Sequence, residues 1–455
     1  MRLLLACAVV ALGALSVPGA GAQEPEPEAT PAPEEDEERP TGLPGKGSWT
    51  FNLDVGLGGF GFANSLYTNV RPDPSGDLGD NWAESYAKPA VSASFGLGET
   101  ELYGAISAVG ERTFAAPPSL LVGESASSFK VEDLSLGWRS GQSLGSSENL
   151  LDVTVGRTPY TIGHGLLLWD GAGEGGSRGG FWSNARKAWE FAAIGRLKPG
   201  SHTLEVFYLD RDELPEADTG TSLWGANYEL KLGEASTFGA TYMRFDADRL
   251  VARKRDGLDV INARAFTSPF AALPDLSFEL EYAREKNGDR LASDAFTGLV
   301  AYEMSDVAWK PKLSYRFAYF EGDHPATAVD EGFDALLPGF YDWGTWWQGE
   351  IAGEYFVSNS NLVSHQARLH LAPSDAVGTG LLFFKLLADE AAAFGPQVTS
   401  RDVAFEMDWY MDWKVNQNFT LSVVGAFANP GALVEQAYGR TKNFAYGMAY
   451  LAYSY

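Results

Sequence analysis

The stretch VAFEMDWYMDW, residues 403–413, alternates large apolar side chains with small, acidic or hydroxyl-bearing ones. Its apolar series is Val403, Phe405, Met407, Trp409, Met411 and Trp413. Its other series contains the carboxylates of Glu406, Asp408 and Asp412. A period of two residues places successive side chains on opposite faces of a β-strand. This stretch is therefore predicted to be a strand with one apolar face and one acidic face.

The same period recurs from SWTFNLDVGLG, at residues 48–58, to the end of the chain. We predict eighteen strands, at about 48–58, 85–97, 101–112, 128–139, 149–157, 185–197, 201–210, 222–233, 236–246, 257–267, 275–286, 293–305, 309–320, 361–372, 376–388, 401–414, 418–428 and 442–455. Many strands carry charges on the polar face, and the apolar face often ends in an aromatic residue. A soluble β-sandwich also alternates, but these two features favour a membrane barrel with aromatic girdles. We therefore predict an all-β, transmembrane antiparallel β-barrel of about 18 strands, within a range of 16–18.

The connections between these strands alternate between short and long. Short ones include 197–200, 305–308 and 372–375, and long ones include 158–184 and 321–360. Bacterial barrels have short periplasmic turns and longer outer loops, so an even strand count places both termini on the periplasmic side. Residues 345–358 resemble a further strand, but counting them would reverse this alternation. We therefore assign them to the large outer loop.

The chain before the barrel falls into two parts. Residues 1–22 have the basic start, apolar run and small-residue cleavage site of a secretory signal peptide, which predicts export to the cell envelope. They contain Cys7, the sole cysteine of the sequence. Residues 23–47 are rich in Pro and Glu and are predicted to be a disordered periplasmic tether. The barrel itself is expected to span 48–455 in the outer membrane, with the lipid bilayer as its partner.

The acidic composition limits the possible functions. A net charge of −26 argues against nucleic acid as a partner. GLGGFG at 56–61 and GQSLG at 141–145 match a dinucleotide fingerprint and a nucleophile elbow, but neither is followed by a predicted helix. Asp73, Asp77 and Asp80 on an outer loop are weak calcium candidates, and a solvated loop explains them as well. We expect no catalytic residues, no enzymatic activity and no cofactor.

Charges that alternation directs into the lumen are the informative residues, because inward positions tune what a barrel passes. The basic candidates are Arg186, Lys312, Arg316 and Arg368, and the acidic ones include Glu279, Glu281, Glu406 and Asp408. Opposite charges around a constriction would suit a polar or charged sugar chain. The alternative is that these charges pair with each other and hydrate a wide pore.

Several segments resemble the bacterial alginate export family of outer-membrane channels. They are LLDVTVGRTPYTIGHGLLL (150–168), FDALLPGF (333–340), NLVSHQARLHLAPSD (361–375) and the acidic strand within 399–427. The resemblance implies an eighteen-stranded channel that passively translocates an acidic polysaccharide. On the matching segments it implies the pore-lining residues Arg157, Arg186, Arg368, Arg401, Glu406 and Asp408.

The excess of acids over bases, 60 to 34, departs from that expectation for a polyuronate. The expected function is therefore a saccharide channel, which would have a saccharide cargo and periplasmic export or assembly proteins as partners. Two alternatives are a porin for the uptake of small solutes and a structural or adhesion barrel.

Overall fold

The fold is that of a computed structural model, which describes residues 47–65, 80–115, 125–145, 148–169, 171–339 and 348–455. The chain forms a sheet of eighteen antiparallel strands. The strands are β1 Gly47–Ala63, β2 Asp80–Leu97, β3 Thr100–Phe114, β4 Ser127–Arg139, β5 Leu151–Thr158, β6 Trp189–Leu197, β7 His202–Asp210, β8 Ser222–Leu232, β9 Ser236–Asp246, β10 Asp259–Thr267, β11 Leu276–Asn287, β12 Leu291–Glu303, β13 Lys312–Phe320, β14 Leu362–Ser374, β15 Val377–Ala388, β16 Asp402–Lys414, β17 Phe419–Pro430 and β18 Phe444–Ser454. Short helical segments lie between some of them: η1 Pro215–Ala217, η2 Gly349–Gly353, η3 Ala391–Phe394 and α2 Ala432–Tyr438.

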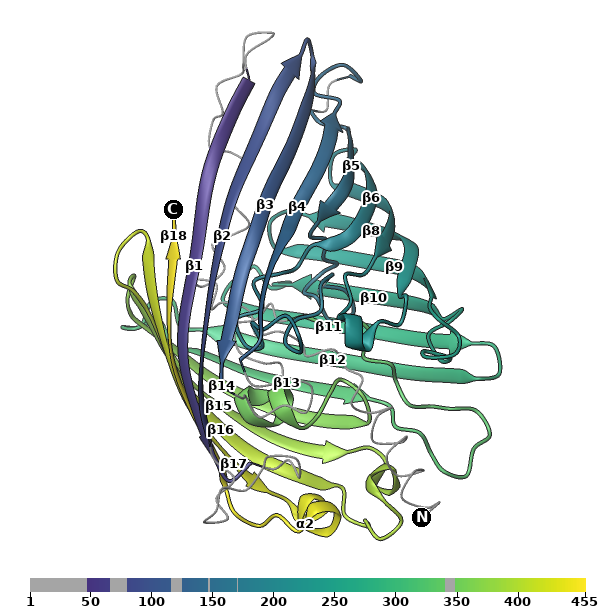
Figure 1. The fold of residues 1–455 in the computed structure, drawn as a ribbon, viewed down its shortest axis with the longest axis vertical. Helices are drawn as coiled ribbons and strands as arrows, with labels where there is room; N and C mark the ends of the chain where they lie inside the picture. The colour runs from purple at the N-terminus through teal and green to yellow at the C-terminus, as the bar shows by residue number, and fades with distance from the viewer. Residues whose placement is uncertain (1–46, 66–79, 116–124, 146–147, 170, 340–347) are drawn as a thin grey trace.

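The sheet closes on itself through its first strand. β1 pairs with β2 on one side and with β18 on the other, and Gly56 lies opposite both Tyr86 and Ala452. Every other strand pairs with its neighbours in sequence, so the eighteen predicted strands and the barrel are confirmed. Figure 1 shows β1 and β18 side by side at the closure. Closure leaves no free sheet edge, so every strand has a hydrogen-bonding partner on both sides.

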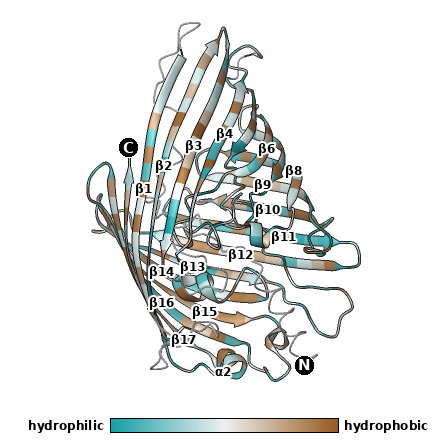
Figure 2. Cartoon of the chain, viewed as in Figure 1, coloured by the Kyte–Doolittle hydropathy of each residue, from teal (hydrophilic) through white to brown (hydrophobic). Residues whose placement is uncertain are grey.

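Alternating side chains divide the wall into an inner and an outer face. Along β16, Phe405, Trp409 and Trp413 are about two-fifths exposed, whereas Glu406 and Asp408 are fully buried. Figure 2 shows apolar and polar positions interspersed along the strands. The facing predicted for these five residues is confirmed.

Val403 departs from that prediction, because it is buried rather than exposed to lipid. The pairing of β15 with β16 shifts register between Leu386 and Leu387, and Gly431 donates its backbone N–H to the carbonyl of Val403. Leu433 and Val434, in the following helix α2, belong to the same buried core. The irregularity and the outer loop therefore cover this end of the strand.

The connections fall into two sets at opposite ends of the barrel. Residues 98–99, 233–235 and 375–376 are short turns at the end where β1 begins and β18 finishes. The opposite end carries the long segments 159–188 and 321–361, although the turn at 288–290 on that side is short. In the described part of 345–358 the chain forms η2 and no strand, which agrees with its assignment to a loop.

Several strand boundaries differ from the sequence-based prediction, and two of these differences affect residues discussed above. β1 continues to Ala63, so GLGGFG lies within a strand. β6 begins at Trp189 rather than at 185, which leaves Arg186 in the preceding loop. None of the helices in the described part of the chain has the length and apolar character of a membrane-spanning helix. The predicted signal peptide and nearly all of the predicted tether lie outside the described residues.

Candidate functional site

Two long loops turn inward and meet each other. Trp169 donates its backbone N–H to the carbonyl of Leu337 at 2.9 Å, and Leu337 donates to Leu167 at 3.1 Å. Gly339 donates to Gly165 at 2.9 Å, so a short parallel pairing joins the two segments. We call the described residues of 159–188 and 321–361 the lumenal plug. Because each loop supports the other, the plug is a single structural unit within the barrel.

The carboxylates of β16 hold one side of the plug. Glu406 accepts the backbone N–H groups of Ile351 at 2.7 Å and of Ala352 at 2.8 Å. Asp408 accepts the N–H of Glu350 at 3.1 Å. These N–H groups belong to the first turns of η2, where backbone donors lack intrahelical partners. A Cβ at Gly349 would collide with the Glu406 carboxylate, so glycine permits this close approach.

Three other wall carboxylates hold the plug in the same way. Glu84 on β2 accepts the N–H groups of Trp182 and Ser183 at 2.8–3.0 Å. Glu132 on β4 accepts those of Lys187 and Ala188 at 2.6 and 2.7 Å. Glu285 on β11 accepts that of Asp334 at 2.8 Å. Buried backbone N–H groups need hydrogen-bond acceptors, so the carboxyl oxygens of these wall residues fix otherwise irregular backbone.

Several carboxyl groups lie close together around η2. Burial, followed by the nearby Asp408 and Asp412, raises the pKa of Glu350 well above its ordinary value. Burial, followed by Glu350 and Glu84, does the same for the pKa of Glu354. Protonated carboxyls avoid the cost of placing several negative charges together in a buried site. The docked plug therefore favours proton uptake at this position.

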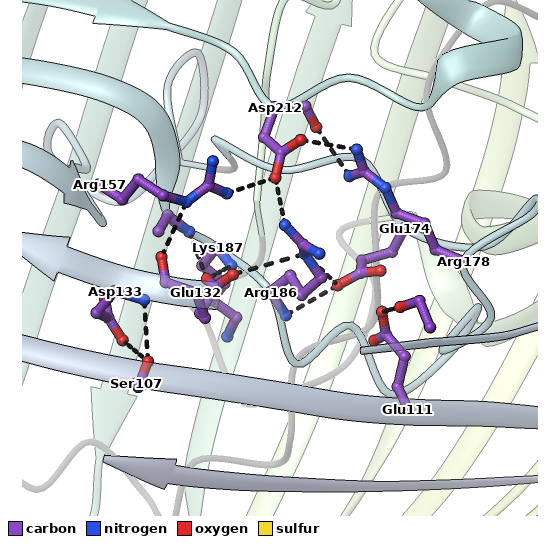
Figure 3. Close-up of polar contacts among 12 residues, drawn as sticks. Ser107, Glu111, Glu132, Asp133, Arg157, Glu174, Arg178, Arg186, Lys187 and Asp212 are labelled. Atoms are coloured by element: carbon purple, nitrogen blue, oxygen red, sulfur yellow. Dashed lines mark hydrogen bonds and ion pairs between the residues drawn. The ribbon is translucent and has the colours of Figure 1, made fainter. Parts of the chain in front are cut away.

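Three arginines converge on Asp212, in the loop after β7 (Figure 3). Arg178 donates to Oδ1 at 2.7 Å and Arg157 donates to Oδ2 at 2.5 Å. The buried Arg186 also pairs with Oδ2, and its guanidinium lies 3.5 Å from Glu132. Burial by itself would raise the pKa of Asp212, but Arg186, Arg178 and Arg157 hold it below its ordinary value. This cluster ties β4, β5, the plug and the loop after β7 together.

Aromatic side chains pack the plug against one wall. Trp182 contacts Phe60 on β1 and Tyr450 on β18, with ring centroids 5.1 and 4.9 Å apart. Tyr355 lies 6.2 Å from Phe444, also on β18. The plug therefore fills the side of the lumen formed by β16–β18, β1 and β2.

The opposite wall retains two adjoining hollows of about 250 and 350 Å³, which include space open to solvent. Both are lined by Glu279 and Leu299. The remaining charged and titratable lining residues are His164, Glu281 and Arg316 in the first hollow and Lys312, Arg368 and His370 in the second. We call this mixed-charge surface of β10–β14 the passage wall.

The strand register orders the charges on the passage wall. Glu279 lies opposite Leu299, which in turn lies opposite Arg316. The Cα atoms of the two charged residues therefore lie about 9–10 Å apart, on either side of one intervening strand. Acids on β11 face bases on β13 and β14 across this surface.

The predicted site residues occupy four different places. Lys312, Arg316 and Arg368 line the hollows. Arg157 and Arg186 belong to the Asp212 cluster, and Glu406 and Asp408 lie under η2 rather than against open water. Arg401 lies just before β16 at the long-loop end, where it pairs with Asp389 at 3.1 Å.

The weak calcium candidates gain no support. Asp73 and Asp77 lie outside the described residues, and Asp80 is only placed as the first residue of β2. Within the described residues, no group of three or more His, Cys, Asp or Glu is arranged to hold a metal ion.

Asp212, Glu84, Glu132 and His164 were not selected from the sequence. Alternation marks Glu84 and Glu132 as inward positions, but only the fold shows that a loop donates to them. Asp212 and His164 lie in loops, where no periodicity assigns a facing.

Solved structures share this fold. OccAB2 of Acinetobacter baumannii matches with a TM-score of 0.56 and 13% identity, covering 89% of this chain and 98% of that one. The outer membrane protein OpdK of Pseudomonas aeruginosa matches at 0.55 and 12%, and OccK5 (OpdH) of the same species at 0.54 and 11%. These cover 89% of this chain and 98% and 97% of theirs. No protein-family model and no curated protein sequence matches the chain, so the resemblance to the alginate export family is not confirmed.

Proposed function

We propose that this chain is an outer-membrane channel through which small polar solutes diffuse along the passage wall. The observation that carries the proposal is the pair of adjoining hollows between the plug and β10–β14. Their lining includes charges of both signs, which suits hydrated, polar solutes rather than apolar ones. The similarity of the fold to solved outer-membrane barrels supports a location in the outer membrane.

This proposal favours small solutes over the expected polysaccharide cargo. A polymer would have to thread past a plug that is bonded to the wall at five carboxylates: Glu84, Glu132, Glu285, Glu406 and Asp408. A small solute needs only the space beside it. No catalytic step is required for diffusion of this kind.

Purified protein in planar bilayers and in liposomes tests the proposal. We expect stepwise ion conductance, together with liposome swelling by monosaccharides and amino acids that declines steeply for longer oligosaccharides. Swelling that is equal for small sugars and long polyuronates would favour polysaccharide transport. The absence of both conductance and swelling would overturn the channel function and favour a structural barrel.

A further inference from the structure

The first plug loop reaches across to the passage wall at His164. The ring of His164 stacks on that of Phe266 in β10, with centroids 3.7 Å apart and an interplanar angle of 8°. Its Nδ1 lies 3.2 Å from Oε2 of Glu279 in β11. The backbone just before it is confined as well, because a Cβ at Gly163 would meet the side chain of Arg264. The loop therefore holds the imidazole in one position on the wall.

His164 is also accessible to the solvent of the hollow. Its side chain is 20% exposed and that of Glu279 is 35% exposed, and both line the hollow that also contains Arg316. A charge change at this imidazole would act on a passing ion, because a cleft with low-dielectric walls focuses the electrostatic field. The position combines a titratable group with a site where solutes pass.

We propose that His164 sets the charge selectivity of the passage. This inference rests on the proposed channel function. With a neutral imidazole, the negative charge of Glu279 lies across from the positive charge of Arg316, and the passage offers both signs to a dipolar solute. With a protonated imidazole, His164 neutralises Glu279 and the basic residues dominate. The channel then favours anions.

The surrounding charges fix the direction of the change. Those facing the imidazole are Arg264 on β10, Glu279 and Glu281 on β11, and Arg316 on β13; Lys312, Arg368 and His370 line the adjoining hollow. Arg264 is engaged with Glu229 at 2.6 Å. The side chains that β12 contributes to this hollow, such as Thr297 and Leu299, are uncharged. Adding a proton at His164 therefore makes a mixed-charge surface more positive.

The test is the reversal potential of the intact protein in planar bilayers under a KCl gradient, measured from pH 5 to pH 8, the range in which histidine ordinarily changes charge. We expect the anion-to-cation permeability ratio to rise by roughly twofold or more as the pH falls. His164→Gln should remove most of this shift while conductance persists. His202→Gln serves as the matched control, because His202 is exposed at the start of β7 and bonds Tyr228 at 2.7 Å.

Glu279→Gln supplies a second measurement. It removes one negative charge whatever the state of His164, so the passage should become more anion-selective than in the wild type at both pH 5 and pH 8. A wild-type reversal potential that is independent of pH, with conductance intact, would overturn the role of His164 alone. So would a shift that survives in His164→Gln. Loss of conductance in the wild type would instead refute the channel function.

Discussion

Ile351 donates its backbone N–H to Oε1 of Glu406 at 2.7 Å, although the two residues lie 55 positions apart in the sequence. The carboxylate belongs to the barrel wall and the donor to a loop from the long-loop end. The acidic face of β16 therefore holds the plug in place, so the alternation of this one strand affects how much of the barrel lumen is filled.

Removal of the Glu406 carboxyl group should loosen the plug. Glu406→Ala leaves the N–H groups of Ile351 and Ala352 buried without an acceptor, which costs about 1–3 kcal/mol for each unsatisfied group. We expect larger and noisier single-channel conductance than in the wild type. Glu234→Gln, in an exposed short turn, is the control and should behave as the wild type. Unchanged conductance in a folded Glu406→Ala barrel would show that the plug does not limit flow.

The plug should also weaken at alkaline pH. Burial, with Asp408 and Asp412, raises the pKa of Glu350 above its ordinary value of 4.5. A raised folded-state pKa contributes stability fully below the unfolded-state value and loses it as the pH rises through the folded-state value. The carboxyl groups of Glu354 and Glu84 also lie nearby, and Tyr446 faces the group from β18. Plug openings, measured as conductance fluctuations, should therefore become more frequent with rising pH.

Glu350→Gln isolates the source of this dependence. The amide keeps the shape of the side chain and cannot ionise, so the rise in fluctuations with pH should become shallower. His164→Gln should leave the pH dependence of the fluctuations unchanged, because His164 contacts Glu279 and Phe266 rather than η2. Fluctuations that rise equally in wild type and Glu350→Gln would contradict this explanation.

The Asp212 cluster should matter for stability far more than a surface ion pair. Asp212→Asn removes the negative charge shared by Arg157, Arg178 and Arg186, and breaking a buried charge pair costs about 3–5 kcal/mol. Asp259→Asn breaks the pair with Arg244, in which both side chains are 40% exposed, and should cost at most about 1 kcal/mol. Guanidinium unfolding midpoints in detergent compare the two variants. Equal midpoints would mean that the cluster does not contribute to the stability of the barrel.

The outer face of β16 gives an assembly test. Trp409 is 40% exposed on the face opposite Glu406 and Asp408, and an arginine on the lipid face costs about 2–4 kcal/mol near the bilayer midplane. Trp409→Arg should lower the yield of folded barrel in lipid vesicles, whereas Trp409→Phe should fold as the wild type. Normal insertion of the arginine variant would place this residue away from the hydrocarbon region.

Much of the barrel was predictable from local patterns. Each of the eighteen predicted strands has a counterpart in the structure. The alternation within a strand is a local pattern that indicates both its extent and which side chains share a face. The misplaced start of β6 has a physical reason. In the sequence, Arg186 continues the alternation of β6. In the structure, its side chain forms ion pairs with Asp212 and Glu132.

The sequence by itself determined the period-two strands, their inner and outer faces and the order of short and long connections, because those depend on side-chain direction within each strand. Only the tertiary structure decided which inward charges meet solvent. Glu406 and Asp408 point inward, as a pore-lining acid would, but a loop from another part of the chain covers them. His164 and Asp212 acquire their partners only when distant loops and strands close around the lumen. Such long-range contacts leave no periodic trace in the sequence.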